Sequence, residues 1–144
     1  MTYTATAPDI DRLDQPLYGA SIGQVFSRFW RKYVTFSGRA SRSEFWWWWL
    51  ISLIVAAVLQ GIGWATSDFS DARNPQFGWG YLPYTLWNIA TFIPNLALNW
   101  RRLHDSNHSG LWVLIGLVPL VGWIVLLVFY LLDSDPQGRR FDRA

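Results

Sequence analysis

The chain has 144 residues, of which 51% are hydrophobic and 15% charged, and its formal net charge is +2. It contains no cysteine, which excludes disulfides, thiolate catalysis and cysteine metal sites. Apolar runs without Lys, Arg, Asp or Glu occur at 45–65, 81–100 and 111–132. Because a helix rises about 1.5 Å per residue, about 20 apolar residues match a hydrocarbon core of about 30 Å. The sequence therefore predicts an all-α integral membrane protein with three transmembrane helices.

The segment before the first apolar run is divided into two parts. Residues 1–20 show no periodicity and predict a disordered arm, so the single membrane domain covers 21–144. Within it, 21–35 predict an amphipathic interfacial helix, with one aromatic side and one basic side that suit anionic lipid. The residues expected at the lipid surface are Phe26, Arg28, Phe29, Trp30, Arg31 and Lys32. The alternative is a helix packed on a soluble partner or on the protein's own loops.

The basic residues predict the orientation in the membrane. Five Lys or Arg lie within about 20 residues before the first span, whereas the loop 66–80 carries only Arg73. This asymmetry predicts a cytoplasmic N-terminus and an uncleaved first span, because the apolar run begins behind a long charged arm. Three crossings then place the polar tail, 133–144, outside. Pro119 and Gly122 in the middle of the third run leave a re-entrant third segment as the alternative.

Charged residues gather at the same ends of the first two spans. Ser41 and Glu44 have the spacing of a capping box, which predicts a helix start at this point. The predicted topology also brings a set of residues to one membrane face, where they are candidates for an interhelical ion network: Arg39, Arg42, Glu44, Arg101, Arg102, His104 and Asp105. Glu44 would pair with Arg101 or Arg102, and Asp105 with an arginine before span one, so that the two spans are clamped together. Simple capping with inside-positive charge is one alternative, and a ligand-binding or catalytic role is another.

The loop after the second run contains two histidines, His104 and His108, with Asp105 between them. Histidines four residues apart on a helix are a metal-site hypothesis, but Gly110 and the polar composition predict a turn, and a third ligand would be needed. Residues adjacent in sequence seldom adopt the geometry of a catalytic triad. We therefore expect no metal, no cofactor and no enzymatic activity, and a loop that caps the third span.

The second span carries a polar stripe at helical spacing. Its members are Tyr84, Asn88, Thr91, Asn95 and Asn99. Amide groups that face lipid would be unpaired, so the stripe is expected to face a helix, a second subunit or water. Few partners are available on the other spans, which favours self-association or a protein partner. Backbone satisfaction around Pro94 is a further alternative.

Two polar segments in this order, Phe36 to Trp46 and Arg101 to Trp112, are followed by Val118-Pro119-Leu120-Val121-Gly122. This arrangement resembles the domain of unknown function 805 family of small bacterial inner-membrane proteins, over roughly residues 25–142. Leu111 stands where the family usually has a tryptophan, and the tail has arginine where the family typically has asparagine. The resemblance implies a polytopic membrane protein with no established activity.

Together these features predict a non-enzymatic inner-membrane protein that acts as an accessory, scaffold or complex-forming component. Its expected partners are the lipid bilayer and either a second copy or another membrane protein, and no nucleic acid. One alternative is a small oligomeric channel or transporter that uses the polar stripe. Another is a lipid-headgroup enzyme acting through His104, Asp105 and the arginines. Coupled ion transport is disfavoured because the spans contain no charged residue.

Overall fold

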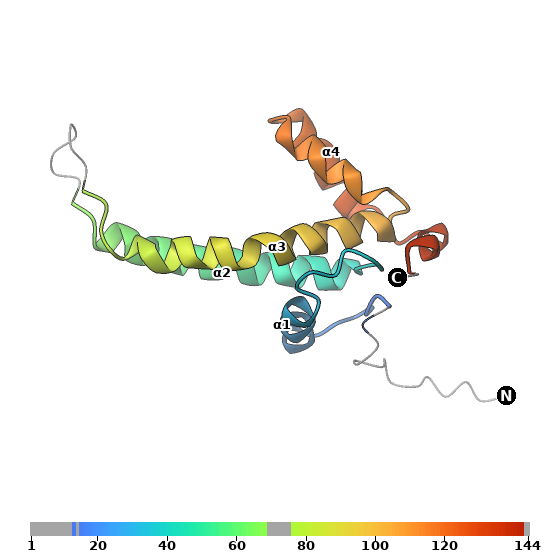
Figure 1. The fold of residues 1–144 in the computed structure, drawn as a ribbon, viewed down its shortest axis with the longest axis horizontal. Helices are drawn as coiled ribbons and strands as arrows, with labels where there is room; N and C mark the ends of the chain where they lie inside the picture. Colours follow the sequence, from blue (N-terminus) through green and yellow to red (C-terminus); the bar gives the residue numbers. More distant parts are fainter. Residues whose placement is uncertain (1–12, 14, 69–75, 143–144) are drawn as a thin grey trace. The chain divides into compact units, whose positions relative to one another are not determined.

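The computed structural model describes residue 13 and residues 15–68 and 76–142. Within these residues the secondary structure is helical and no strand is formed, which confirms the all-α prediction (Figure 1). The helices in chain order are α1 (Ile22–Arg31), α2 (Arg42–Ala65), α3 (Tyr81–Asp105), the 3-10 helix η1 (Gly110–Leu117), α4 (Val121–Leu131) and the 3-10 helix η2 (Pro136–Phe141). The chain divides into two compact units, one made of 1–48 with 94–144 and the other of 49–93.

Helix α2 begins where the capping box predicts it. The Ser41 amide donates to Oε2 of Glu44 at 3.0 Å, and the Glu44 amide donates to Oγ of Ser41 at 3.2 Å, so the predicted box is confirmed. Among the described residues α2 is the one helix that is both long enough and apolar enough to cross a membrane. Helix α3 is one residue longer, with 25 residues against 24, but its polar side chains lower its mean hydropathy.

The unit of residues 49–93 is a helical hairpin formed by the end of α2 and the start of α3 (Figure 1). A Cβ atom at Gly63 would lie 2.7 Å from the ring of Tyr81, so glycine permits the close approach of the two helices. Polar side chains at the end of α2 hold the returning chain, because the Gly80 amide donates to Oγ1 of Thr66 at 3.1 Å. The Gly78 amide likewise donates to Oγ of Ser67 at 2.8 Å.

The predicted third span is not one continuous helix. Residues 111–132 form η1 and α4, which are separated by a sharp bend and pack on each other. Pro119 disfavours helical backbone at the residue before it, and Val118 is accordingly extended with φ −90° and ψ 107°. Leu120 adopts a positive φ of 64°. The absence of a side chain at Gly122 lets α4 approach η1, because a Cβ atom there would lie 1.7 Å from the carbonyl oxygen of Ile115.

The tail returns to the residues that precede α2. The Gly38 amide donates to the carbonyl of Phe141 at 2.8 Å, and Arg39 pairs with Asp142 through Nε and Oδ1 at 2.8 Å. A tail on the opposite membrane face from the arm would be unable to make these contacts. The contacts bring the tail next to the arm, as the re-entrant alternative expects, and the side of the membrane on which the tail lies stays a prediction.

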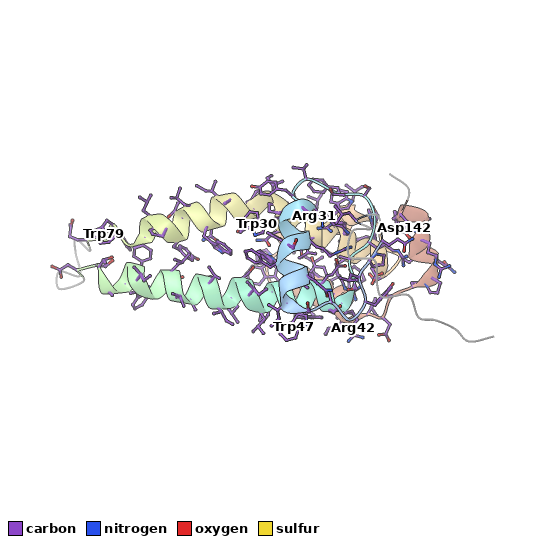
Figure 2. All side chains as sticks on the ribbon, turned by 90° about the horizontal axis from the view of Figure 1, so that it is seen from below. Trp30, Arg31, Arg42, Trp47, Trp79 and Asp142 are labelled. Carbon is purple, nitrogen blue, oxygen red and sulfur yellow. The ribbon has the colours of Figure 1, made fainter. Side chains whose placement is uncertain are left out.

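The end of the N-terminal arm is packed rather than extended. Most of the predicted disordered segment, 1–20, lies outside the described residues, but Leu17 and Ala20 are buried. The Leu17 amide donates to Oε2 of Glu44 at 3.2 Å. From this point α1 crosses the adjoining ends of α2 and α3 (Figure 2). The ring of Phe29 stacks on Trp48, with centroids 3.3 Å apart, and Trp48 Nε1 donates to Oδ1 of Asn95 at 2.7 Å.

The bend between η1 and α4 can be tested with a pair of glycine substitutions. Gly122→Ala forces a Cβ atom against backbone that cannot yield, so we expect the hairpin to open with a loss of about 1 to 3 kcal/mol, the usual cost of overpacking. At Gly116 a Cβ atom meets only the flexible end of Leu126 at 3.0 Å, so Gly116→Ala is the matched control and should cost less. The measurement is equilibrium unfolding in detergent micelles, and equal losses in both variants would contradict the packing described.

Candidate functional site

The compact unit made of 1–48 and 94–144 holds an unusual number of buried polar side chains, which we call the polar core. It contains Arg28, Lys32, Arg39, Ser41, Glu44, Arg101, Arg102, His104, Asp105 and Ser106. Buried charges are stable only when they are paired and hydrogen-bonded. The arrangement of pairs therefore decides what this cluster can do.

Glu44 is the acceptor at the start of α2. Its Oε1 accepts from Nε of Arg28 at 2.6 Å, with both side chains buried. Its Oε2 accepts from the amides of Leu17 and Ser41. Glu44 was predicted to pair with Arg101 or Arg102. In the structure it pairs instead with Arg28 of α1, whose side chain points into the polar core. This pair fastens α1 and the end of the arm to the first turn of α2.

Asp105 is the acceptor at the end of α3, and its side chain is 0% exposed. Oδ2 accepts from Nη1 of Arg102 at 2.7 Å, Oδ1 lies 3.5 Å from Nη1 of Arg39, and the hydroxyl of Ser134 also donates to the carboxylate. Tyr18 contributes a further hydroxyl at 3.4 Å. Burial raises the pKa of Asp105, while the bond from Ser134 and the charges of both arginines lower it. The predicted pairing of Asp105 with Arg39 is present in the structure.

Arg102 and Arg42 connect the polar core to the end of α4 and to the residues that follow it. Arg102 donates through Nη2 to the carbonyl of Tyr130 at 3.0 Å and also to the carbonyl of Leu132. These carbonyls lie at the end of α4, where the helix leaves its last carbonyls unpaired. Arg42 pairs with Asp133, and this pair is exposed, at 47% and 91% of the two side chains. An exposed pair contributes little to stability.

The side chain of His104 is held by contacts within the fold. Its Nδ1 lies 3.0 Å from the carbonyl oxygen of Gly38, and because a carbonyl only accepts, Nδ1 carries the hydrogen. Its ring stacks on Phe141 with a centroid distance of 4.0 Å. Burial lowers the pKa of His104, and the bond to Gly38 acts in the opposite direction. Gly38 has a φ of 81°, which residues other than glycine disfavour. This conformation turns the carbonyl of Gly38 toward His104.

The two histidines do not converge on one point. His108 Nδ1 contacts Oγ of Ser106 at 3.2 Å, and its ring stacks on Phe129 with centroids 4.2 Å apart. Within the described residues no group of three or more His, Cys, Asp or Glu is arranged to hold a metal. Ser109 caps η1 by accepting from the Leu111 amide at 3.3 Å. The polar loop thus ends α3 and starts the hairpin of η1 and α4.

The residues predicted for the lipid surface separate into two groups. Arg28, Phe29 and Lys32 are buried, in contrast to the prediction, whereas Phe26 and Arg31 are exposed and Trp30 is half-buried. The inward face of α1 therefore mixes basic and apolar side chains. This arrangement differs from the separation that the sequence pattern suggested, because Glu44 supplies a buried partner for Arg28.

The polar stripe of α3 is largely satisfied by its own helix. Side chains of Asn88, Thr91 and Asn99 each donate to the carbonyl four residues earlier, at 2.7, 2.8 and 2.9 Å. Asn95 accepts from Trp48 instead, and Tyr84 is half-buried and supplies the carbonyl for Asn88. These bonds supply the partners that sequence reasoning assigned to another helix, subunit or water.

Several members of the cluster lie outside the predicted set. Tyr18, Ser134 and Asp142 contact Asp105 or Arg39, and Leu17 binds Glu44. The sequence indicates these contacts only through acidic and hydroxyl side chains in the N-terminal arm and the polar tail. Such residues become partners only when both ends of the chain meet.

The pairing at Glu44 generates a quantitative prediction. Glu44→Gln removes the buried carboxylate that accepts from Arg28, so we expect a loss of about 3 to 5 kcal/mol in the free energy of unfolding. Arg42→Gln is the control, because its exposed pair should be worth at most about 1 kcal/mol. A double-mutant cycle between Glu44→Gln and Arg28→Gln, measured by unfolding in mixed micelles, should give strong coupling. Coupling below a few tenths of a kcal/mol would show that capping alone accounts for Glu44.

Comparison with known proteins identifies the family of this chain. The family described as "Protein of unknown function (DUF805)" matches residues 33–143. "Inner membrane protein YhaI" of Escherichia coli (strain K12) is 42% identical over 114 residues, which cover 77% of this chain and 86% of that protein. "Inner membrane protein YhaH" of the same strain is 35% identical over 115 residues, covering 77% and 87%. No solved structure matches. The chain is a membrane protein that belongs to the DUF805 family.

Proposed function

We propose that this protein is a non-enzymatic, multi-pass component of the bacterial inner membrane, in which a folded cytoplasmic polar core serves as an accessory or scaffold element. The observation that carries the proposal is that the buried charged residues pair with one another. Glu44, Asp105 and their arginines bind one another within the fold. Residues that are committed to buried pairs hold elements together and are not available to a substrate.

Helix lengths and charge support two full crossings. The apolar parts of α2 and α3, 45–65 and 81–100, are each about 30 Å long at about 1.5 Å per residue, which matches the hydrocarbon core. If the tail shares a face with the arm, 11 of the 12 Lys and Arg lie on that face by sequence position, and only Arg73 lies on the other. With a tail on the opposite face the bias would be weaker. The positive-inside rule therefore favours a cytoplasmic position for both the arm and the tail.

The hairpin of η1 and α4 has the properties of a re-entrant segment. Helix α4 has 11 residues, about 16 Å, which is about half the thickness of the core. Large apolar side chains are exposed on both of its parts, among them Leu111, Leu114, Leu117, Leu120, Val121, Trp123, Ile124, Leu127, Val128 and Leu131. Trp123 Nε1 donates to the carbonyl of Gly116 at 3.0 Å, so the bend keeps a polar group satisfied inside the protein. We propose that this hairpin enters the cytoplasmic leaflet and returns.

Exposed aromatic residues support a bilayer contact for α1. Ile22 and Phe26 on α1 are exposed, as are Trp47 and Trp49 near the start of α2. Trp47 lies at the edge of the region where α1 crosses α2 (Figure 2). Aromatic and apolar side chains at the end of a spanning helix favour the headgroup level. We propose that this edge of α1 lies on the membrane while its basic residues stabilise the polar core.

We also propose association with a second copy or another membrane protein, through one part of the polar stripe on α3. Of the stripe on α3, Asn88 is exposed next to Ile89 and Phe92. Its side chain donates to the carbonyl of Tyr84, which leaves its amide oxygen as an acceptor toward a neighbouring helix. This part of α3 is the surface that we assign to helix association.

The topology can be tested with single cysteines, because the chain contains none. Gln76→Cys in the loop between α2 and α3 and Gln137→Cys in η2 both replace exposed residues. We expect a thiol reagent that does not cross membranes to label Gln76→Cys in intact spheroplasts, and Gln137→Cys only after permeabilisation. Labelling of both positions in intact spheroplasts would contradict the re-entrant segment and restore three crossings.

The bilayer contact of α1 can be tested with spin labels at four exposed positions. Labels at Ile22→Cys and Phe26→Cys should respond more to oxygen, which concentrates in lipid, and labels at Ser27→Cys and Arg31→Cys more to a water-soluble nickel complex. The protein is reconstituted in vesicles with anionic lipid. Equal exposure of all four positions to the nickel complex would remove the membrane contact from the proposal.

A further inference from the structure

A cavity of about 460 Å³ lies between the N-terminal arm and the tail, beside the polar core. Its wall contains three residues of the arm, Arg39 from the turn before α2, and five residues of the tail between Ser134 and Asp142. Cavities that bind small molecules usually measure about 300 to 1,000 Å³. The volume is therefore sufficient for a small organic ligand.

The inner wall of this cavity is held by the polar core. Arg39 pairs with Asp142 through two hydrogen bonds of 2.8 Å, and the hydroxyls of Tyr18 and Ser134 both donate to the carboxylate of Asp105. These bonds order side chains from three segments before any ligand arrives, which lowers the entropic cost of binding. The charges of Arg39 and Asp142 offset each other, so the selectivity of the cavity depends on its other charged residues.

Two wall residues of opposite charge keep their capacity to bind. The guanidinium of Arg139 is exposed and forms no hydrogen bond or ion pair with any residue that the structure describes. The carboxylate of Asp135 accepts from the amide of Gln137 through Oδ1 at 2.8 Å, which leaves Oδ2 without a partner in the same part of the chain. One cavity thus presents an available cation and an available anion.

A ligand that matches this wall carries both signs of charge. A simple anion would bind Arg139 but would also meet the carboxylate of Asp135, and a simple cation would bind Asp135 but meet Arg139. A guanidinium binds carboxylate or phosphate oxygens through paired N–H donors, and a carboxylate accepts strongly from an ammonium group. Only a zwitterion makes both of these charge-assisted contacts at once.

We propose that this cavity binds a small zwitterion, whose oxyanion group contacts Arg139 and whose primary ammonium group contacts Asp135. Two sources offer this chemistry, soluble compounds such as dipeptides and the ethanolamine phosphate headgroup of a lipid. Because the wall combines the arm with the tail, the bound ligand would connect these two segments and stabilise the polar core. The inference goes beyond the proposed scaffold role and does not depend on the membrane topology.

The test is a ligand-observed NMR titration of the full chain in micelles of a nonionic detergent. The two zwitterionic probes are glycerophosphoethanolamine, compared with glycerophosphoglycerol and ethanolamine, and glycylglycine, compared with N-acetylglycine and glycinamide. Each comparison compound retains only one of the two charges. We expect at least one zwitterion to bind about tenfold or more tightly than its analogues, because each analogue loses a charge-assisted contact. Absence of binding by both zwitterions, or equal binding by the analogues, would overturn the proposal.

A further titration separates the two sources of the ligand. Dihexanoyl phosphatidylethanolamine, which enters the micelle, competes with bound glycerophosphoethanolamine, and dihexanoyl phosphatidylglycerol serves as its control without an amine. Tighter binding of the ethanolamine lipid than of the soluble headgroup supports the site and assigns it to the bilayer. Equal or weaker binding of that lipid supports the site and assigns it to a soluble compound. Displacement by both lipids to the same extent would contradict the role of Asp135.

Two variants with matched controls connect binding to the two charges. Arg139→Gln and Asp135→Asn should each weaken the zwitterion about tenfold or more, to the affinity of a single-charge analogue. Neither side chain is buried, and asparagine caps a helix as well as aspartate does, so both variants are expected to fold. The controls Arg140→Gln and Asp133→Asn make the same changes of charge at exposed residues outside the cavity and should bind normally. Full affinity in both Arg139→Gln and Asp135→Asn would overturn the site.

Discussion

The carboxylate of Asp105 is the point on which the polar core depends. Four segments that are distant in sequence contact it: Tyr18 from the arm, Arg39 from the turn before α2, Arg102 from α3 and Ser134 from the tail. Its backbone carbonyl also accepts from the amide of Asp135 at 2.8 Å. A buried carboxylate with fewer donors would be strongly destabilising. The requirement to satisfy this one group therefore fixes where both ends of the chain lie.

Glu44 organises the other half of the polar core in the same way. It joins the capping of α2 to the docking of α1, because one oxygen accepts from Arg28 and the other from two backbone amides. Charge-assisted bonds of this kind have strict geometry. Apolar packing alone, such as the stack of Phe29 on Trp48, would allow α1 to slide. The ionic contacts thus specify a single position for α1, whose outer edge is apolar.

Much of the fold follows from local rules, and the failures have physical causes. The helices at 45–65 and 81–100 follow from apolar length, and the start of α2 follows from the capping box. For the third segment, Pro119 offered a bend as the alternative, but a count of apolar residues does not decide between a crossing and a bend. Partner choice within the cluster was beyond sequence reasoning as well, since several arginines compete for each acid. Only the packing of α1 shows that Glu44 receives Arg28.

The polar core is built from residues of both the arm and the tail, so it is completed only late in synthesis. Its last essential contributors, at 134–142, leave the ribosome only after α2 and α3 have been synthesised. During insertion Arg39 and Arg102, which Asp105 later binds, are therefore still hydrated and still able to contribute to the positive-inside bias. Once the tail arrives, the same charges are withdrawn from water and neutralised by acids. Under the proposed topology these cations would act on the orientation while they are exposed, and their later burial would oppose inversion, because inverting the protein would require the whole core to be dismantled.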